Sequence, residues 1–144
     1  MRITTKYILS LDPCKDRLDN YLNFYKDTDF SVAEFLKLEN LSYTDKIWVW
    51  KKFATINEAA LFGLKCAESV LHIFESKYPG DKRPSKALES VRSFLNDPTE
   101  ENKKLCRAAN AAANAANAAY AADAASARKT QQDKNIQFLV EIYS

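Results

Sequence analysis

The residues best suited to covalent chemistry are Cys66 and His72, because a thiol beside an imidazole can form a nucleophile with its base. His72 is the only histidine in the 144 residues. If this stretch is helical, six positions separate the two side chains and place them about 120° apart around the axis. They do not form a ready pair. A hydrolase using Cys66 or Cys106 is thus a distant alternative, and we predict no catalytic residue.

Motifs that hold metals, nucleotides or phosphates are absent from the sequence. It contains no CxxC or HExxH spacing for a metal ion and no GxGxxG or Walker loop for a nucleotide. Two glycines in the whole chain make a phosphate-cradling loop implausible. The paired carboxylates Asp16 and Asp19, like Glu100 and Glu101, fit solvated helix faces. We therefore predict neither a metal site nor a cofactor.

The best candidate for an exposed binding feature is the loop KYPGDKRP at residues 77–84. Its Pro-Gly-Asp turn lies within a cluster of charged residues: Lys77, Asp81, Lys82, Arg83 and Lys86. An arginine in such a loop can bind a carboxylate or a phosphate through two parallel hydrogen bonds. The alternative is a local role, in which Asp81 caps the next helix and Arg83 pairs with Glu75 or Glu89.

A second candidate surface is the acidic N-terminal region. Residues 12–45 carry eight acidic and four basic side chains, whereas residues 46–144 carry eleven acidic and fifteen basic ones. Neither region has the dense Lys/Arg stripe of a duplex-DNA binder, so nucleic acid is not an expected partner. The acidic region is either ordinary solvated surface or a face for a basic partner. Its candidate residues are Asp16, Asp19, Asp27 and Asp29.

The elements that position these residues are predicted to be helices. The chain is 47% hydrophobic, with two Trp, seven Tyr and eight Phe, which is enough material for a core. Two glycines and four prolines do not suit the many tight turns of an all-β protein. We predict one all-α domain over residues 1–144, a bundle of about five to seven helices. Residues 1–54 form its N-terminal helices, with the acidic face, and residues 55–144 form its core.

Local signals place several helix boundaries. Asp12-Pro13 indicates a helix start with Asp12 as the N-cap, while the preceding TKYILSLDP fits either a strand or a helix. Ser31 and Glu34 form a capping box. From Thr55 onward, apolar residues recur at steps of four and three, which predicts a central helix. Its inner face consists of Ala60, Leu64, Ala67, Leu71, Phe74 and Tyr78. The helix expected from Pro84 has its own inner face, formed by Ala87, Leu88, Val91 and Leu95.

Residues 108–127 form an alanine tract in which fourteen of twenty positions are alanine. Because alanine has the highest helix propensity, we predict a long C-terminal helix here. Its Asn110, Asn114 and Asn117 either belong to the packing of that helix or face a partner. The tract is too polar to span a membrane. Three widely spaced cysteines suit a reducing compartment, and the N-terminal residues do not resemble a signal peptide, so we predict a cytoplasmic protein.

The stretch CAESVLHIFESKYPGDKRPSKALESVRSFLND, followed by the alanine tract, resembles the putative-immunity-protein family. This family is associated with bacterial polymorphic toxin systems and also occurs in phages and mobile elements. Its pattern CAE-x-VL-x-x-FE-x-x-YP-x-D-x-RP-x-x-A-x-E is matched in order from Cys66 to Glu89. The similarity extends over residues 36–144. Lys65 and Gly80 depart from the pattern, because acidic residues are common at both positions in the family.

The resemblance implies an all-helical, non-catalytic protein that binds another protein, a toxin, and neutralises it by occlusion. Two alternatives remain open. The same scaffold in a phage or mobile element could block a host nuclease complex, as an anti-CRISPR-like inhibitor does. Alternatively, the alanine face could hold a homodimer together. The family's motif residues could also be structural, with Arg83 tying the loop to Glu68 or Glu75.

Overall fold

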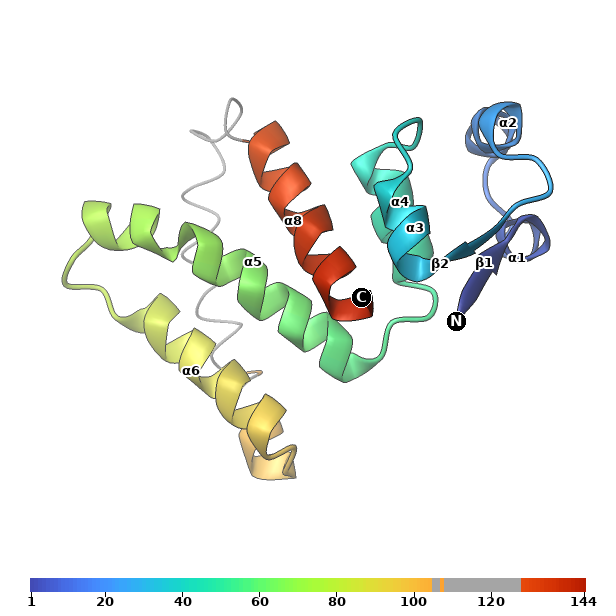
Figure 1. Cartoon of the computed structure of the whole chain (residues 1–144). Coiled ribbons are helices and arrows are strands. Elements are labelled where there is room, and N and C mark those ends of the chain that lie inside the picture. Colours follow the sequence, from blue (N-terminus) through green and yellow to red (C-terminus); the bar gives the residue numbers. More distant parts are fainter. Residues whose placement is uncertain (105–106, 108–127) are drawn as a thin grey trace. The chain divides into compact units, whose positions relative to one another are not determined.

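The computed structural model describes residues 1–104, 107 and 128–144. These residues are predominantly helical, which confirms the all-α prediction (Figure 1). The predicted alanine-tract helix, with Asn110, Asn114 and Asn117, lies outside the described residues, as does Cys106.

Contacts within the chain divide it into two compact units. Unit 1 comprises Met1–Thr55 together with Gln132–Ser144, and unit 2 comprises Ile56–Gln131. The boundary after Thr55 lies one residue from the predicted division between residues 54 and 55. The C-terminal residues, however, group with the N-terminal helices. The organisation of residues 1–144 as a single domain stays a prediction.

Unit 1 begins with a small antiparallel sheet that the sequence did not indicate. β1 (Arg2–Thr4) pairs with β2 (Asp29–Ser31), and Ile3 is fully buried opposite Phe30. α1 (Thr5–Ser10) follows β1 directly, so the segment that fitted either a strand or a helix is helical. Thr4 caps α1 because its Oγ1 accepts a hydrogen bond from the Tyr7 N–H at 3.1 Å.

The predicted helix start at Asp12-Pro13 is wrong, because α2 spans Lys15–Phe24 and has Cys14 at its N-cap. Asp12 instead ends α1. Its φ of 51° is left-handed, and its N–H donates to the Leu9 carbonyl at 3.3 Å. A left-handed residue just after a helix, followed by proline, is a common helix ending, and aspartate tolerates this conformation better than most residues. The Asp-Pro pair therefore marks a stop rather than a start.

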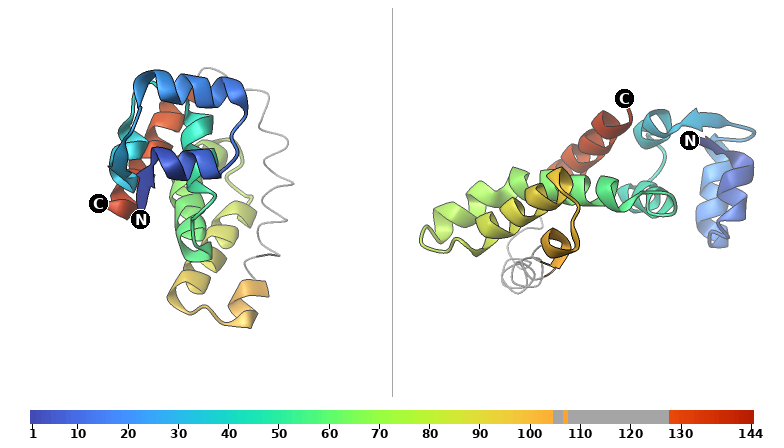
Figure 2. Two further views of the ribbon diagram at one scale, coloured as in Figure 1. Left: turned by 90° about the vertical axis from the view of Figure 1, so that its right-hand side faces the viewer. Right: turned by 90° about the horizontal axis from the view of Figure 1, so that it is seen from below.

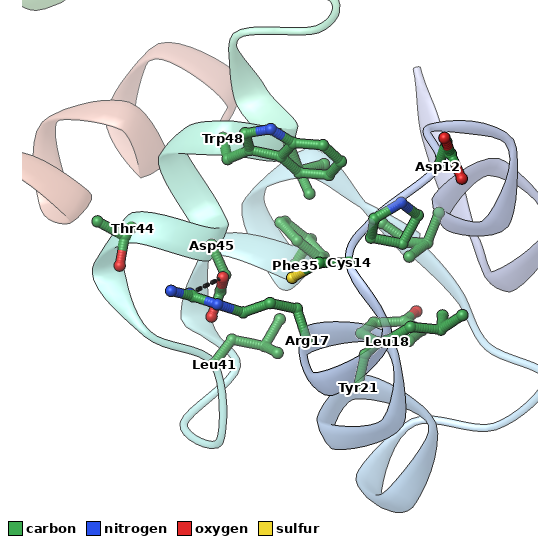
Figure 3. Close-up of a pocket in the computed structure, with 13 residues that line it drawn as sticks. Asp12, Cys14, Arg17, Leu18, Tyr21, Phe35, Leu41, Thr44, Asp45 and Trp48 are labelled. Carbon is green, nitrogen blue, oxygen red and sulfur yellow. Dashed lines mark hydrogen bonds and ion pairs between the residues drawn. The ribbon is translucent and has the colours of Figure 1, made fainter.

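The next two helices of unit 1 are short and capped by serines. α3 (Val32–Lys37) carries the predicted capping box, in which the Ser31 hydroxyl accepts from the Glu34 N–H and the Glu34 carboxylate accepts from the Ser31 N–H. α4 (Tyr43–Trp50) begins after its N-cap Ser42. An ion pair from Arg17 of α2 to Asp45 links α2 to α4 (Figure 3). These caps satisfy N–H groups that a helix start leaves without a partner.

The core of unit 1 draws on both ends of the chain. α8 (Arg128–Tyr143) supplies the buried Leu139 and Val140. The indole N–H of Trp50, itself buried, donates to the Tyr143 hydroxyl at 3.1 Å. The other buried apolar residues of this unit are Ile3, Ile8, Tyr21, Val32, Phe35, Leu36, Leu41 and Val49.

Unit 2 is built on two helices, α5 (Ile56–Lys77) and α6 (Arg83–Asn96), which lie side by side (Figures 1 and 2). Residues 100–104 are also helical. One buried cluster of this pair consists of Leu64, Leu88 and Val91, packed by Ala60, Ala67, Leu71 and Leu95. Ala87 and Phe94 of α6 are buried as well. The predicted inner face is thus confirmed as far as Leu71. It does not extend to Tyr78, which lies beyond the end of α5 and is 44% exposed.

Candidate partner-binding loop

The charged residues of the predicted loop meet where α5 ends and α6 begins. Lys77 is the last residue of α5, Arg83 is the first residue of α6, and Lys86 lies in the first turn of α6. Lys82 is the N-cap, and the Asp81 N–H donates to the Tyr78 carbonyl at 3.1 Å to close the turn. We call residues 77–86 the basic loop, because this segment contains four cationic side chains and one carboxylate.

Arg83 is held by Asp81, and not by Glu75, Glu89 or Glu68 as the local alternatives expected. Its Nε lies 2.9 Å from one carboxylate oxygen, its Nη2 lies 2.5 Å from the other, and its backbone N–H donates to Oδ1 at 3.0 Å. The expected partners are used elsewhere, since Glu75 accepts from Ser85 and Glu68 pairs with Arg92. Asp81 lies two residues from Arg83 in the sequence, so the bidentate pair forms within the loop itself. It fixes the orientation of the guanidinium at the start of α6.

The pairing with Arg83 is expected to lower the pKa of the Asp81 carboxyl. Hydrogen bonds from the Arg83 guanidinium, and next from its backbone N–H, lower the pKa of Asp81 from 3.8 to about 2. Because the folded pKa is the lower one, the contribution of this carboxylate to stability is present above pH 3.8 and is lost as the pH falls through about 2. A carboxyl-carbon NMR titration should give a midpoint near 2, and Arg83→Gln should move it toward 3.8.

Lys82→Gln serves as the control for this titration, because it removes a neighbouring charge and leaves the Asp81–Arg83 hydrogen bonds in place. A wild-type midpoint near 3.8 would show that the pair does not form in solution.

An exposed aromatic ring accompanies the cations of the basic loop. Tyr78 is 44% exposed, and its ring centroid lies 5.1 Å from that of Phe74. The Lys77 Nζ lies 6.0 Å from the Tyr78 centroid, at the outer limit of a cation–π contact. Lys82 and Lys86 of the same loop are also exposed. The loop therefore offers a tyrosine, an oriented arginine and several lysines on one short segment.

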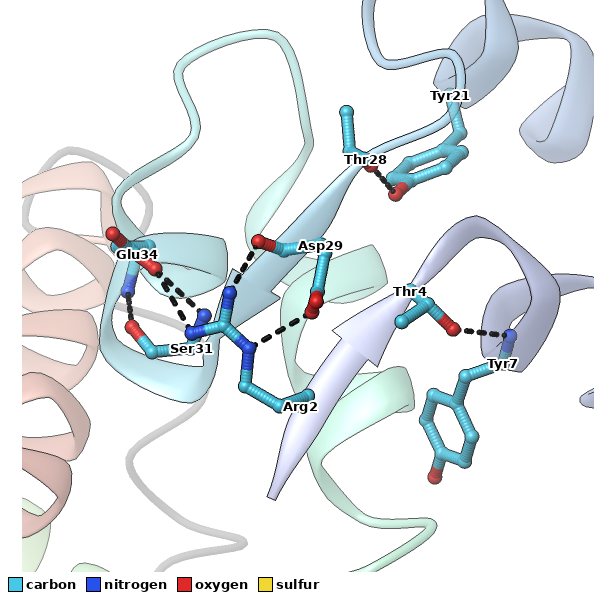
Figure 4. A network of polar contacts seen from close by, with 8 residues as sticks. All are labelled: Arg2, Thr4, Tyr7, Tyr21, Thr28, Asp29, Ser31 and Glu34. Carbon is cyan, nitrogen blue, oxygen red and sulfur yellow. Dashed lines mark hydrogen bonds and ion pairs between the residues drawn. The ribbon is translucent and has the colours of Figure 1, made fainter.

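The acidic candidates do not form one face. Asp29 is bound by Arg2 across the sheet, with Nε to Oδ1 at 2.8 Å (Figure 4). Asp16 and Asp19 are exposed on the side of α2 away from the buried Tyr21. Asp27 lies in the turn before β2 with a left-handed φ of 49°. Asp29 is thus already paired, Asp16 and Asp19 share one side of α2, and Asp27 lies in a separate turn.

Of the groups considered for chemistry, Cys66 and His72 are described by the structure, and they are not arranged for it. Cys66 is half-buried in α5, and this burial raises the pKa of its thiol to about 11, the reverse of what a nucleophile needs. His72 is exposed on the same helix. Within the part of the chain that the structure describes, no three His, Cys, Asp or Glu side chains gather as metal ligands.

A feature that the sequence did not predict is a cavity in unit 1, lined by α1, α2, α3, α4 and the connections between them. Each of its apolar residues fits a core position when the sequence is considered alone. Only the spacing of Cys14, Arg17, Leu18 and Tyr21, which share one face of α2, could have indicated a lined surface.

Comparison with known proteins gives one match. The family model described as "Imm-5 like putative immunity protein" matches residues 54–133. No curated protein matches the chain, and no solved structure does. The matched segment begins and ends within two residues of unit 2, which comprises Ile56–Gln131 and includes the basic loop.

Among the described residues, no helix has both the length and the apolar character needed to cross a membrane. The match over residues 54–133 covers more than half of the 144 residues and contains the motif from Cys66 to Glu89. The chain belongs to the Imm-5 like putative immunity protein family.

Proposed function

We propose that this protein binds a toxin and neutralises it by occlusion, with the basic loop as a principal contact. Membership of an immunity-like family supports a protein as the partner. The observation that carries the proposal is the basic loop itself. It lies inside the matched segment and combines the exposed Tyr78 with Arg83, which Asp81 holds in place. Tyrosine and arginine are among the residues that contribute most to protein interfaces.

The charge of the loop indicates the kind of surface it would cover. Four cations against one carboxylate favour a partner with an acidic rim around its functional site. Complementary charges accelerate encounter, and this acceleration weakens as salt rises. Inhibition by occlusion requires a specific surface and no chemistry on the inhibitor, which agrees with the half-buried, protonated Cys66.

The test uses the full-length chain with an affinity tag in its native host. The wild-type protein should capture one protein that arrests growth when expressed alone, and co-expression of the two should restore growth. The variant Lys82→Glu/Lys86→Glu should weaken this capture about tenfold, the change that corresponds to about 1.4 kcal/mol of binding free energy. The substitutions leave the Asp81–Arg83 pair in place.

The matched control is Lys104→Glu/Lys129→Glu, which changes the net charge equally at two exposed lysines outside the loop. It should bind as the wild type does. Equal capture by the loop variant and the wild type would remove the loop from the proposal. Capture of a host nuclease complex would favour the anti-defence alternative, and capture of a second copy alone would favour a homodimer.

A further inference from the structure

The cavity in unit 1 lies outside the segment that the family model matches, so family membership does not account for it. Its volume is about 480 Å³, within the range of pockets that bind ligands. Phe35 of α3 and Tyr21 of α2 are buried in its wall, and Leu18 and Trp48 line it from α2 and α4 (Figure 3). Trp48 is still 37% exposed, so the cavity has an open mouth.

The two ends of the cavity differ in charge. At one end Arg17 pairs with Asp45, whose other oxygen accepts from the Ser42 hydroxyl at 2.6 Å. These two charges cancel. Asp12 also lines the cavity; it is exposed, and its carboxylate forms no hydrogen bond or ion pair with any residue that the structure describes. The lining therefore carries one negative charge without a counter-ion.

The backbone at Asp12 is fixed by the end of α1, whereas its side chain is exposed. The backbone of Asp12 has a left-handed φ of 51°. Pro13 is the next residue, and its ring fixes its own φ angle. Asparagine also tolerates the left-handed conformation, so Asp12→Asn removes the charge without requiring a new backbone. The position thus offers a substitution that separates the charge from the fold.

We infer that this cavity receives apolar side chains from a basic segment of the partner protein, with a lysine or arginine of that segment paired to Asp12. The inference rests on the proposed function in one respect, since it takes the occupant to be a protein. Charge complementarity supports a basic segment, because Arg17 and Asp45 of the lining neutralise each other and leave the negative charge of Asp12. The open mouth beside Trp48 suits side chains entering from a surface, whereas small ligands are usually enclosed over most of their area.

The experiment measures peptide binding to the full-length protein by tryptophan fluorescence. The probe is an acetylated helical 12-residue peptide with Leu and Phe four positions apart and Lys at the flanking positions. Binding should shift the emission of the exposed Trp48 to shorter wavelength, and Trp48→Phe should remove most of this signal, because Trp50 is already buried. The same peptide with Ser in place of Leu and Phe should not bind.

Charge variants then locate the contact. Asp12→Asn should weaken binding of the lysine peptide about two- to five-fold, as expected for a surface ion pair. It should leave a glutamine version of the peptide unaffected. Glu101→Gln is the matched control, because it changes the net charge equally at an exposed carboxylate that does not line the cavity. It should bind the lysine peptide as the wild type does.

Three results would overturn the inference. They are equal binding of a glutamate version of the peptide, no fluorescence change with any peptide, and tighter binding of free indole than of the lysine peptide. The Lys82→Glu/Lys86→Glu variant should still bind the peptide. If the peptide binds and the wild-type protein captures no growth-arresting protein, the proposed function fails alone. If loop reversal abolishes capture and no peptide binds, the cavity inference fails alone.

Discussion

Replacement of Phe35 by alanine is expected to lower the free energy of unfolding of unit 1 by about 3–5 kcal/mol, as for other buried phenylalanines. Phe35 is 1% exposed and is among the largest fully buried side chains of the described residues. Its loss enlarges the cavity at its side and removes packing from the core. Domains are stable by about 5–15 kcal/mol, so the change is a large fraction of the total.

Urea unfolding followed by tryptophan fluorescence measures this effect, because both tryptophans, Trp48 and Trp50, lie in unit 1. Phe35→Leu is the control and should cost less, since it keeps most of the buried apolar volume. A loss below about 1 kcal/mol for the alanine variant would mean that Phe35 is not packed as the structure places it.

Leu88→Ala is expected to have a comparable effect in unit 2, with a loss of about 2–5 kcal/mol. Leu88 forms a buried cluster with Leu64 and Val91, so its truncation removes a large part of that cluster. Amide hydrogen exchange should then show reduced protection along both helices. Leu88→Met nearly preserves volume and should cost less than about 1.5 kcal/mol. Unchanged protection in α5 after Leu88→Ala would contradict this account of the core.

The parts of the fold that the sequence predicted correctly depend on local signals. The Ser31–Glu34 capping box operates over three residues, and the inner face from Ala60 to Leu71 is a repeat within one helix. Such patterns specify a helix and its buried side before any tertiary contact forms.

The features that the sequence did not predict depend on residues far apart or on a choice between two local outcomes. β1 and β2 are three-residue strands joined through a register of Arg2 with Ser31, too short to show an alternating pattern. Asp12-Pro13 is compatible with either end of a helix, and its left-handed φ decides between them.

The candidate sites follow the same division. The basic loop could be predicted because its charges are neighbours in the sequence, although the partner of Arg83 could not. The cavity combines residues from α1, α2, α3, α4 and the connections between them. Each of these residues, taken alone in the sequence, is typical of an ordinary buried or solvated position. The cavity exists only where the folded unit brings them together, so the sequence does not indicate it.

The grouping of Gln132–Ser144 with the N-terminal residues makes unit 1 discontinuous in sequence, with unit 2 inserted between its two parts. A ribosome therefore completes all of unit 2 before it delivers Leu139, Val140 and the Tyr143 hydroxyl that binds Trp50. During synthesis, α5 and α6 can pair as soon as both have emerged. The N-terminal helices must wait for the last turns of α8 to close their core. In the nascent chain, α5 and α6 can thus pair before synthesis of the unit whose two parts flank them in the sequence is complete.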